Sequence, residues 1–215
     1  GQADDRTLRE DVRALLAETP DLERALGRLS LGRGGPRDLV SIREGLKAGS
    51  AIARRLAGVP GLPDELAHAI THLQDPPEVV GHLDDALDNE PPLLARDGGF
   101  VRKGHVKALD GATALRDDSR RHIAALQTRY QEAAGVPSLK VRHNNMLGYY
   151  VETTQVHADK LDRDIFIHRQ TMANAMRFTT VELGELEAKI SQAGDRAVAL
   201  ELEVFAALVE EILVA

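Results

Sequence analysis

Residues 181 to 214 carry a heptad pattern of apolar side chains, and this pattern constrains the fold more than any other feature. Apolar residues recur there in alternating steps of three and four, which is typical of a long helix that packs along one face. At about 1.5 Å per residue, such a helix would be on the order of 50 Å long. The members of the stripe are Leu183, Leu186, Ile190, Ala193, Ala197, Leu200, Val204 and Ala207.

A second apolar stripe runs from His105 to about Ala134 and ends at Gly135-Val136-Pro137, which indicates a helix end. The second helix would be on the order of 45 Å long. Two long stripes that flank a compact insert predict an antiparallel helix pair with the insert at its tip. The members of this stripe are Leu109, Ala112, Leu115, Ser119, Ile123, Leu126 and Tyr130.

Composition agrees with a mainly helical chain. Of the 215 residues 43% are hydrophobic, but only 3% are aromatic and none is Trp, so the core must consist mostly of Leu, Ala, Val and Ile. The absence of Cys excludes disulfides and thiolate metal sites and agrees with the cytoplasmic location that we expect. No stretch approaches the roughly 20 apolar residues of a membrane span. Because the sequence starts at Gly1 rather than Met, we expect either processing or an excised piece of a longer protein.

The first 104 residues are predicted to form short helices that are separated by Pro and Gly. One helix is expected to bury Leu22, Leu26 and Leu29, and another, with Pro36 in its first turn, to bury Leu39, Ile42 and Leu46. Residues 91 to 102 are predicted to form two short strands around an Asp97-Gly98 turn. The other predicted helices cover residues 4–18, 50–57, 64–73 and 78–88.

The insert between the long helices begins with alternating apolar and basic residues. Leu139 and Val141 alternate with Lys140 and Arg142, which predicts a half-buried strand with a positive outer face. A turn at Asn144-Asn145 and a second strand through Tyr149, Tyr150 and Val151 should follow.

The distribution of charge makes an anion the first candidate ligand of this insert. The formal net charge of −7 would argue against nucleic acid, because phosphate contacts favour positive surfaces. Residues 137 to 180, however, hold six cations and four acids, whereas residues 181 to 215 hold two cations and eight acids. A module of which only the tip meets a polyanion would have this distribution.

Several segments carry a family resemblance, and their shared order and spacing make it specific. The insert resembles the clamp region of the bacterial MutS family of DNA mismatch-recognition proteins, and upstream segments are similar to signatures of the family's core, or lever, domain. The segments of the insert are LKVRHNNMLGYYVE (139–152), RQTMANAMRF (169–178) and EL (182–183), and the upstream segments are DLERALGRL (21–29), PRDL (36–39) and RDGG (96–99).

The resemblance implies a mainly α fold in which two long antiparallel helices carry a small strand-containing clamp. It implies a first part of the core domain at 1–134, a clamp at 135–180 and a returning lever helix at 181–215. No Phe is followed two positions later by Glu, as in the family's mismatch-reading motif, and no phosphate-binding Gly-x-x-x-x-Gly-Lys-Ser/Thr loop occurs. We therefore expect no catalysis and no cofactor in this chain, whereas the parent protein should be a DNA-dependent ATPase that uses ATP and Mg. Expected partners are double-stranded DNA, a second MutS subunit and a MutL-type protein, and no membrane.

The resemblance also suggests which residues bind the DNA backbone, and two residues depart from the family's pattern. Arg169 and Asn174 have the firmest correspondence. Ala173 and Met176 stand where many relatives have Lys and Glu, so one expected cation is missing. The predicted set is Lys140, Arg142, Asn144, Asn145, Arg169, Gln170, Asn174 and Arg177.

Other interpretations of these features stay open. Lys140 and Arg142 could be a charged strand edge that prevents aggregation, and Arg177 could brace the start of the last helix. Tyr149 and Tyr150 fit packing better than base stacking. His68 and His72, four residues apart, have no third metal ligand fixed by spacing, so we expect no metal site. The alternative function is a structural or protein-docking helical hairpin of a MutS-like paralogue without a role in mismatch recognition.

Overall fold

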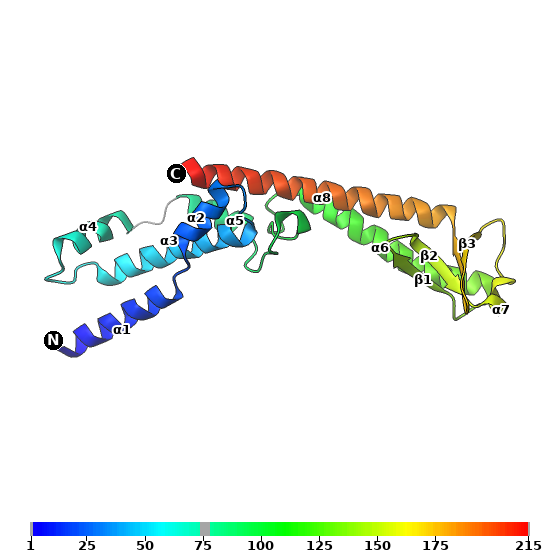
Figure 1. Ribbon diagram of the computed structural model, residues 1–215, viewed down its shortest axis with the longest axis horizontal. Helices are drawn as coiled ribbons and strands as arrows, with labels where there is room; N and C mark the ends of the chain where they lie inside the picture. Colours follow the sequence, from blue (N-terminus) through cyan, green and yellow to red (C-terminus); the bar gives the residue numbers. More distant parts are fainter. Residues whose placement is uncertain (1, 74–77, 215) are drawn as a thin grey trace. The chain divides into compact units, whose positions relative to one another are not determined.

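The computed structural model describes residues 2–73 and 78–214 (Figure 1). The chain forms two compact units: one comprises the residues up to His105 together with those from Val198 onward, and the other comprises Val106–Ala197. The mainly helical fold with a small strand-containing insertion is confirmed. The division into a core part at 1–134, a clamp at 135–180 and a lever helix at 181–215, which the resemblance implies, stays a prediction.

The first unit contains short helices whose starts follow from the sequence. Asp21 caps α2, because its Oδ1 accepts a hydrogen bond from the Arg24 amide at 2.9 Å. Pro36 occupies the first turn of α3, where a missing N–H costs nothing, and the Asp38 carboxylate accepts from the Gly35 amide at 2.8 Å. The bounds are α1 Gln2–Glu18, α2 Leu22–Ser30, α3 Pro36–Leu56, α4 Asp64–Leu73, α5 Glu78–Ala86 and the 3₁₀ turn η1 Ala95–Asp97.

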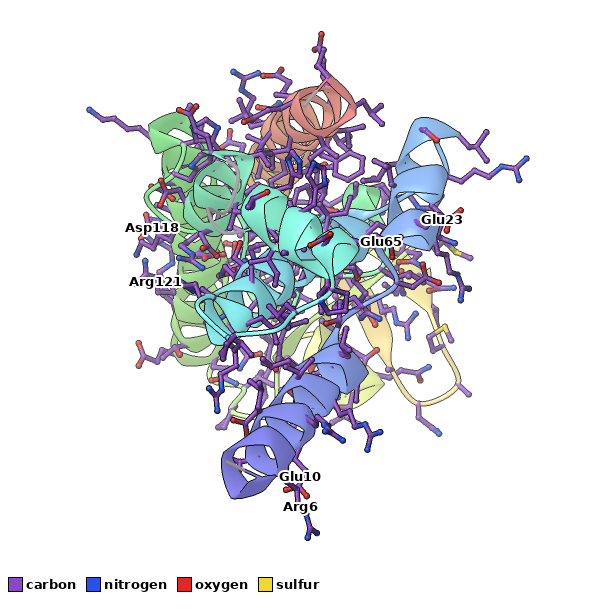
Figure 2. All side chains as sticks on the ribbon, turned by 90° about the vertical axis from the view of Figure 1, so that its left-hand side faces the viewer. Arg6, Glu10, Glu23, Glu65, Asp118 and Arg121 are labelled. Carbon is purple, nitrogen blue, oxygen red and sulfur yellow. The ribbon has the colours of Figure 1, made fainter. Side chains whose placement is uncertain are left out.

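Exposed helix surfaces carry local ion pairs. Figure 2 labels Arg6 and Glu10, one turn apart on α1, where Nε and Oε1 lie 3.0 Å apart. It also labels Asp118 and Arg121 on α6, a helix of the second unit, where the ion pair spans 3.6 Å. Exposed pairs of this kind contribute only tenths of a kcal/mol, roughly 0.2–0.5 each. Burial of apolar faces must therefore supply most of the stability.

Helices α3 and α2 each correct one prediction for this unit. The separate helix expected at residues 50–57 is the continuation of α3, because Ala53 and Leu56 extend the buried face that begins at Leu39. In α2 the buried residues are Ala25 and Leu29, whereas Leu26 is 43% exposed. The predicted three-leucine face of α2 was therefore wrong at Leu26.

The prediction of two strands around Asp97-Gly98 was wrong. Residues Ala95–Asp97 form η1, and a single β-bridge pairs Leu87 with Val101. The amides of Gly99, Phe100 and Val101 donate to the buried Glu201 carboxylate at 2.6, 3.0 and 3.0 Å. Because this side chain uses the donors that a second strand would need, no ladder forms.

The second unit consists of two helices and a four-stranded antiparallel sheet. In Figure 1, α6 (green) and the adjoining part of α8 (orange) run in opposite directions, and the sheet lies between their ends. The strand order is β1-β2-β4-β3. Helix α8 continues into the first unit at Val198. The bounds are α6 Lys107–Ala134, β1 Lys140–Asn144, β2 Gly148–Thr153, α7 Gln155–Ala158, β3 Ile167–Thr171, β4 Met176–Thr179 and α8 Val181–Val214.

The predicted end of α6 is confirmed, because Gly135 caps the helix in a left-handed conformation with φ of 63°.

The core of the second unit joins both helices to one face of the sheet. The core cluster contains Ile123, Leu126, Tyr130, Val136, Leu139, Val151, Ala158, Leu161, Phe166, Phe178, Leu183, Leu186 and Ile190.

Both predicted helix stripes deviate from the structure at single positions. Leu115 of α6 is 52% exposed, and near the end of α8 the buried residues are Glu201 and Leu208 rather than Ala207. A straight helix drifts by about 20° per heptad against a strict seven-residue repeat, so the buried face moves to neighbouring positions.

Over residues 2–73 and 78–214, none of the helices combines the length and the apolarity that crossing a membrane requires.

Candidate nucleic-acid interface

The sheet of the second unit has an apolar inner face and a polar outer face. Val141, Val151 and Phe178 point to the core, because they belong to or pack against its hydrophobic cluster. Side chains alternate along a strand, so their neighbours occupy the opposite face. The pairing of Lys140 with Glu152, Arg142 with Tyr150, and Glu152 with Arg177 aligns these neighbours across three strands. The outer face includes Lys140, Arg142, Tyr150, Glu152 and Arg177.

One carboxylate connects two arginines on this outer face. Arg142 Nε lies 3.2 Å from Glu152 Oε1, and Arg177 Nε lies 3.0 Å from Glu152 Oε2. Each carboxylate oxygen therefore accepts from a different guanidinium. Lys140 is the cross-strand partner of Glu152, so three of the predicted DNA-binding cations lie around a single acid.

The two arginines differ in how firmly they are held. Arg177 also donates from Nη1 to Gln170 Oε1 at 3.1 Å, and its guanidinium carbon lies 4.7 Å from the centre of the Tyr150 ring. Its side chain is 20% exposed, whereas that of Arg142 is 57% exposed. Arg177 is thus fixed on the sheet surface, while Arg142 is the more accessible cation. Tyr150 is only 5% exposed, which agrees with the packing role expected for one of the two tyrosines.

Arg169 and Asn174 are exposed residues of the β3–β4 hairpin. The pairing of β3 with β4 shifts register between His168 and Gln170, so Arg169 is the extra residue of a β-bulge. Asn174 lies in the turn that the hydrogen bond from Met172 N–H to the Ala175 carbonyl closes at 2.7 Å. Both side chains are presented to solvent.

The paired asparagines form the opposite end of the sheet. Asn144 Oδ1 accepts hydrogen bonds from the Met146 and Leu147 amides at 3.0 and 2.7 Å. This arrangement makes the β1–β2 turn, so the Asn144 oxygen is occupied within the protein. Asn145 is exposed in the same turn. Because Thr153 rather than Gly148 of β2 pairs with Met176, the β1–β2 and β3–β4 turns lie at opposite ends of the sheet.

The eight predicted residues therefore do not converge on a single point. Lys140, Arg142, Gln170 and Arg177 gather on or beside the outer face, whereas Asn144, Asn145 and Asn174 lie in the turns at its ends and Arg169 in the bulge. This distribution suits an extended ligand along the sheet better than a small molecule.

Sequence reasoning did not select Glu152, Lys160 and Arg163. Lys160 and Arg163 are exposed in the segment between α7 and β3, and the Arg163 guanidinium lies 5.3 Å from the centre of the Phe178 ring. The basic content of residues 137 to 180 was the available signal for both. Nothing in the sequence distinguished Glu152, because the strand register alone brings it between the arginines.

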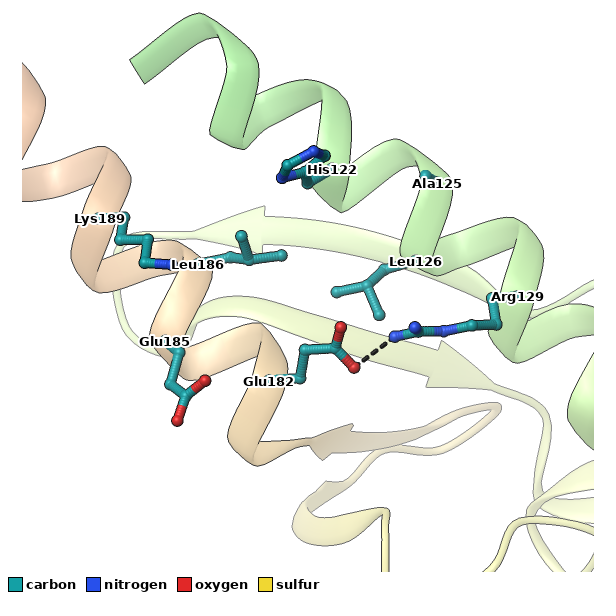
Figure 3. Close-up of a pocket in the computed structure, with 8 residues that line it drawn as sticks. All are labelled: His122, Ala125, Leu126, Arg129, Glu182, Glu185, Leu186 and Lys189. Atoms are coloured by element: carbon teal, nitrogen blue, oxygen red, sulfur yellow. Dashed lines mark hydrogen bonds and ion pairs between the residues drawn. The ribbon is translucent and has the colours of Figure 1, made fainter. Parts of the chain in front are cut away.

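A second set of charges connects the two helices at the base of the sheet. Figure 3 shows the contact between Arg129 of α6 and Glu182 of α8, at one end of a groove of about 440 Å³. The hydrogen bond and the charge of Glu182 raise the pKa of Arg129, and burial raises the pKa of Tyr130 beside it. Arg129 stays cationic, and Tyr130 stays neutral. This contact holds the first turn of α8 to the last turns of α6.

The histidine pair forms a contact within α4. The Nε2 atoms of His68 and His72 are 3.4 Å apart. No group of three or more His, Cys, Asp or Glu side chains that could hold a metal ion occurs within residues 2–73 and 78–214.

The fold and the site define a helical arm that carries a small sheet with a cationic outer face. Residues 104–196 match the family described as MutS family domain IV. The chain is 52% identical over 206 residues to the DNA mismatch repair protein MutS of Nitrobacter winogradskyi, covering 94% of this chain and 23% of that protein. It is also 52% identical over 220 residues to MutS of Rhizobium meliloti, covering 98% of this chain and 24% of that protein. The chain therefore belongs to the MutS family, and it spans about a quarter of the length of these curated relatives.

Proposed function

We propose that this chain is the core and clamp part of a MutS-type DNA mismatch repair protein and that its outer sheet face contacts the phosphate backbone of duplex DNA. The observation that carries this proposal is the gathering of Lys140, Arg142 and Arg177 on one sheet face in a chain of net charge −7. An acidic protein that concentrates cations on one surface has a place for a polyanion.

The chemistry of the site favours contact with phosphates over reading of bases. Guanidinium and ammonium groups neutralise phosphates and fix the position of the duplex without discriminating sequence. Tyr150 lies under Arg177 and is 5% exposed, so its ring is not available for stacking on a base. The clamp would thus hold matched and mismatched duplexes alike.

The wider proposals concern the longer protein of which this chain would be a part. We propose that the longer protein hydrolyses ATP with Mg in another domain, that it works in the cytoplasm as a homodimer with a MutL-type partner, and that this chain itself catalyses nothing. Helix α8 has residues in both compact units, so it connects the second unit, which carries the sheet, to the first unit without a break in the helix. A rotation of the helix could be passed on through this connection.

Binding of a fluorescent duplex over a salt series tests the contact with phosphate. Each phosphate contact contributes about 0.9 to the slope of log affinity against log salt. We expect Lys140→Ala, which removes an exposed cation of the outer face, to weaken binding and to flatten that slope by about 0.9. The matched control is Arg121→Ala on α6, which removes the same charge from a side chain that is 76% exposed and lies outside the sheet. It should leave the slope unchanged.

The assay should use both the 215-residue chain and the longer protein, because a single clamp lacks the avidity of two linked clamps. If neither protein binds duplex DNA at low salt, or if Lys140→Ala and Arg121→Ala behave alike, the proposal is wrong. The alternative of a protein-docking hairpin would then be preferred.

A further inference from the structure

Glu152 lies between Arg142 and Arg177 on the outer face, where an external anion would meet both guanidinium groups. Its two oxygens lie 3.2 Å from Arg142 Nε and 3.0 Å from Arg177 Nε, and Lys140 is its cross-strand partner. A phosphate also offers oxygens to arginine N–H groups in this way. The carboxylate thus engages the same donors that a DNA phosphate would need.

We infer that Glu152 is an internal competitor of the DNA phosphate for Arg142, an inference that rests on the proposed function and adds a means of setting its strength. In the free protein the carboxylate holds Arg142. On binding, Arg142 exchanges the carboxylate for a phosphate, while Glu152 keeps its bond to Arg177. No covalent bond forms or breaks, and the exchange requires only that the Arg142 side chain change its rotamer.

The contacts of the two arginines decide which one exchanges. Arg177 is 20% exposed and is held by Glu152, by Gln170 and by the Tyr150 ring. Arg142 is 57% exposed, and Glu152 is the carboxylate with which it forms an ion pair in the described part of the chain. Side chains with few partners lose least when they move. Arg142 is therefore the exchanging cation, and Arg177 and Glu152 form the support that remains.

This exchange makes the grip weaker and easier to release. Every contact from Arg142 to a phosphate must first replace an ion pair, so it gains less than a contact from an unpaired arginine would. For a clamp that must open and close on DNA of any sequence, a moderate affinity is useful.

Glu152→Gln tests the inference at the level of single atoms. Glutamine has the same shape but only one oxygen, so it can accept from Arg177 and must present its amide nitrogen to Arg142. We expect Arg142 to be released in the free protein and duplex affinity to rise about threefold to tenfold. The salt slope should stay about the same, because Arg142 contacts a phosphate in both complexes. Asp159→Asn is the matched control, because it makes the same charge change at an exposed acid of the same segment. It should increase affinity less and leave the slope unchanged.

A double variant separates competition from other effects of Glu152. In an Arg142→Ala background, Glu152→Gln should no longer raise affinity, because the cation for which the two anions compete is gone. An unchanged gain in that background, or a Glu152→Gln variant that binds no more tightly than Asp159→Asn, would overturn the inference.

The inference can also be tested in the unaltered protein, in case the substitution destabilises the sheet. When duplex DNA is added, the Nε–H resonance of Arg142 should shift more than that of Arg177, which keeps its bond to Glu152. A shift of Arg177 as large as that of Arg142, or of Arg177 alone, would contradict the exchange. The Lys140→Ala variant keeps the two proposals distinguishable. If it has no effect on binding, the DNA contact of the outer face itself fails, whereas weakened binding with no gain from Glu152→Gln refutes only the competition.

Discussion

The hydroxyl oxygens of Tyr130 and Thr180 lie 2.7 Å apart and are buried. Tyr130 belongs to the last two turns of α6, and Thr180 is the residue immediately before α8. Thr180 Oγ1 also accepts a hydrogen bond from the Leu183 amide at 3.0 Å, which makes it the N-cap of α8. One hydroxyl therefore starts the returning helix and attaches it to the outgoing helix.

Thr180→Ala is expected to lower the free energy of unfolding by about 2 kcal/mol. Loss of a helix cap costs about 1 kcal/mol, and the Tyr130 hydroxyl would lose its buried partner at a similar cost. Urea denaturation followed by circular dichroism measures the change. Thr180→Ser keeps the hydroxyl and should lie much closer to the unaltered protein. Equal losses for the two variants would show that the methyl group, rather than the cap, is responsible.

The long helices were predictable because their signal is repeated many times. The stripe of α8 placed the helix at residues 181 to 214, and Gly135 marked the end of α6. Strands β3 and β4 were missed for the opposite reason. Strand β3 lies at the sheet edge, and four of its five side chains are exposed, so its sequence shows no apolar alternation.

The sequence predicted which charged residues the candidate site contains but not how they pair. The basic residues of the insert were visible in the sequence, but the ion pair between Glu152 and Arg177 joins residues 25 positions apart. Strand register sets that distance, and register depends on how the whole sheet packs. The buried Glu201 was missed likewise, because an acid in an apolar stripe reads as a surface charge until its three amide donors are known.

Glu201→Gln should lower the free energy of unfolding by about 2–3 kcal/mol. The carboxylate accepts three backbone N–H bonds, and bonds to a charged acceptor contribute roughly twice as much as neutral ones. A glutamine in this position would turn its own donors toward at least one of these amides. Chemical denaturation is the measurement, and Glu203→Gln, at an exposed position of the same helix, is the control. A control variant that loses as much stability would contradict the role of the amide contacts.

The pair of His82 and Glu211 should make the stability of the first unit depend on pH. His82 Nδ1 lies 2.5 Å from a Glu211 oxygen, and this hydrogen bond, together with the charge of Glu211, raises the pKa of His82 above 6.5. A raised pKa in the folded state means that the stabilisation is complete below about pH 6.5 and is lost as the pH rises through the raised value.

The melting temperature of the Glu211→Gln variant should therefore fall furthest below that of the unaltered protein near about pH 6, and the difference should shrink toward about pH 8. The carboxylates of Glu78 and Asp85 also raise the pKa of His82, so a small pH dependence should remain in the variant. Glu210→Gln, at the neighbouring exposed position, should show a constant difference from the unaltered protein. A gap that widens with pH would mean that the pair acts in the opposite sense.

Gly148→Ala should be more damaging than Gly135→Ala, although both glycines have similar positive φ values of 69 and 63. At Gly135 the added Cβ would meet open space, so the cost is backbone strain of about 1–2 kcal/mol. At Gly148 the Cβ would also clash with the Glu187 carboxylate, which accepts from the Tyr149 amide at 3.3 Å. The flexible Glu187 side chain can move away but then loses this hydrogen bond, so we expect about 1 kcal/mol of loss beyond the strain, measured by urea denaturation. If Glu187→Ala destabilises the unaltered protein but not the Gly148→Ala variant, the lost contact is the cause of the excess, whereas equal losses for the two glycine variants would leave strain as the only cost.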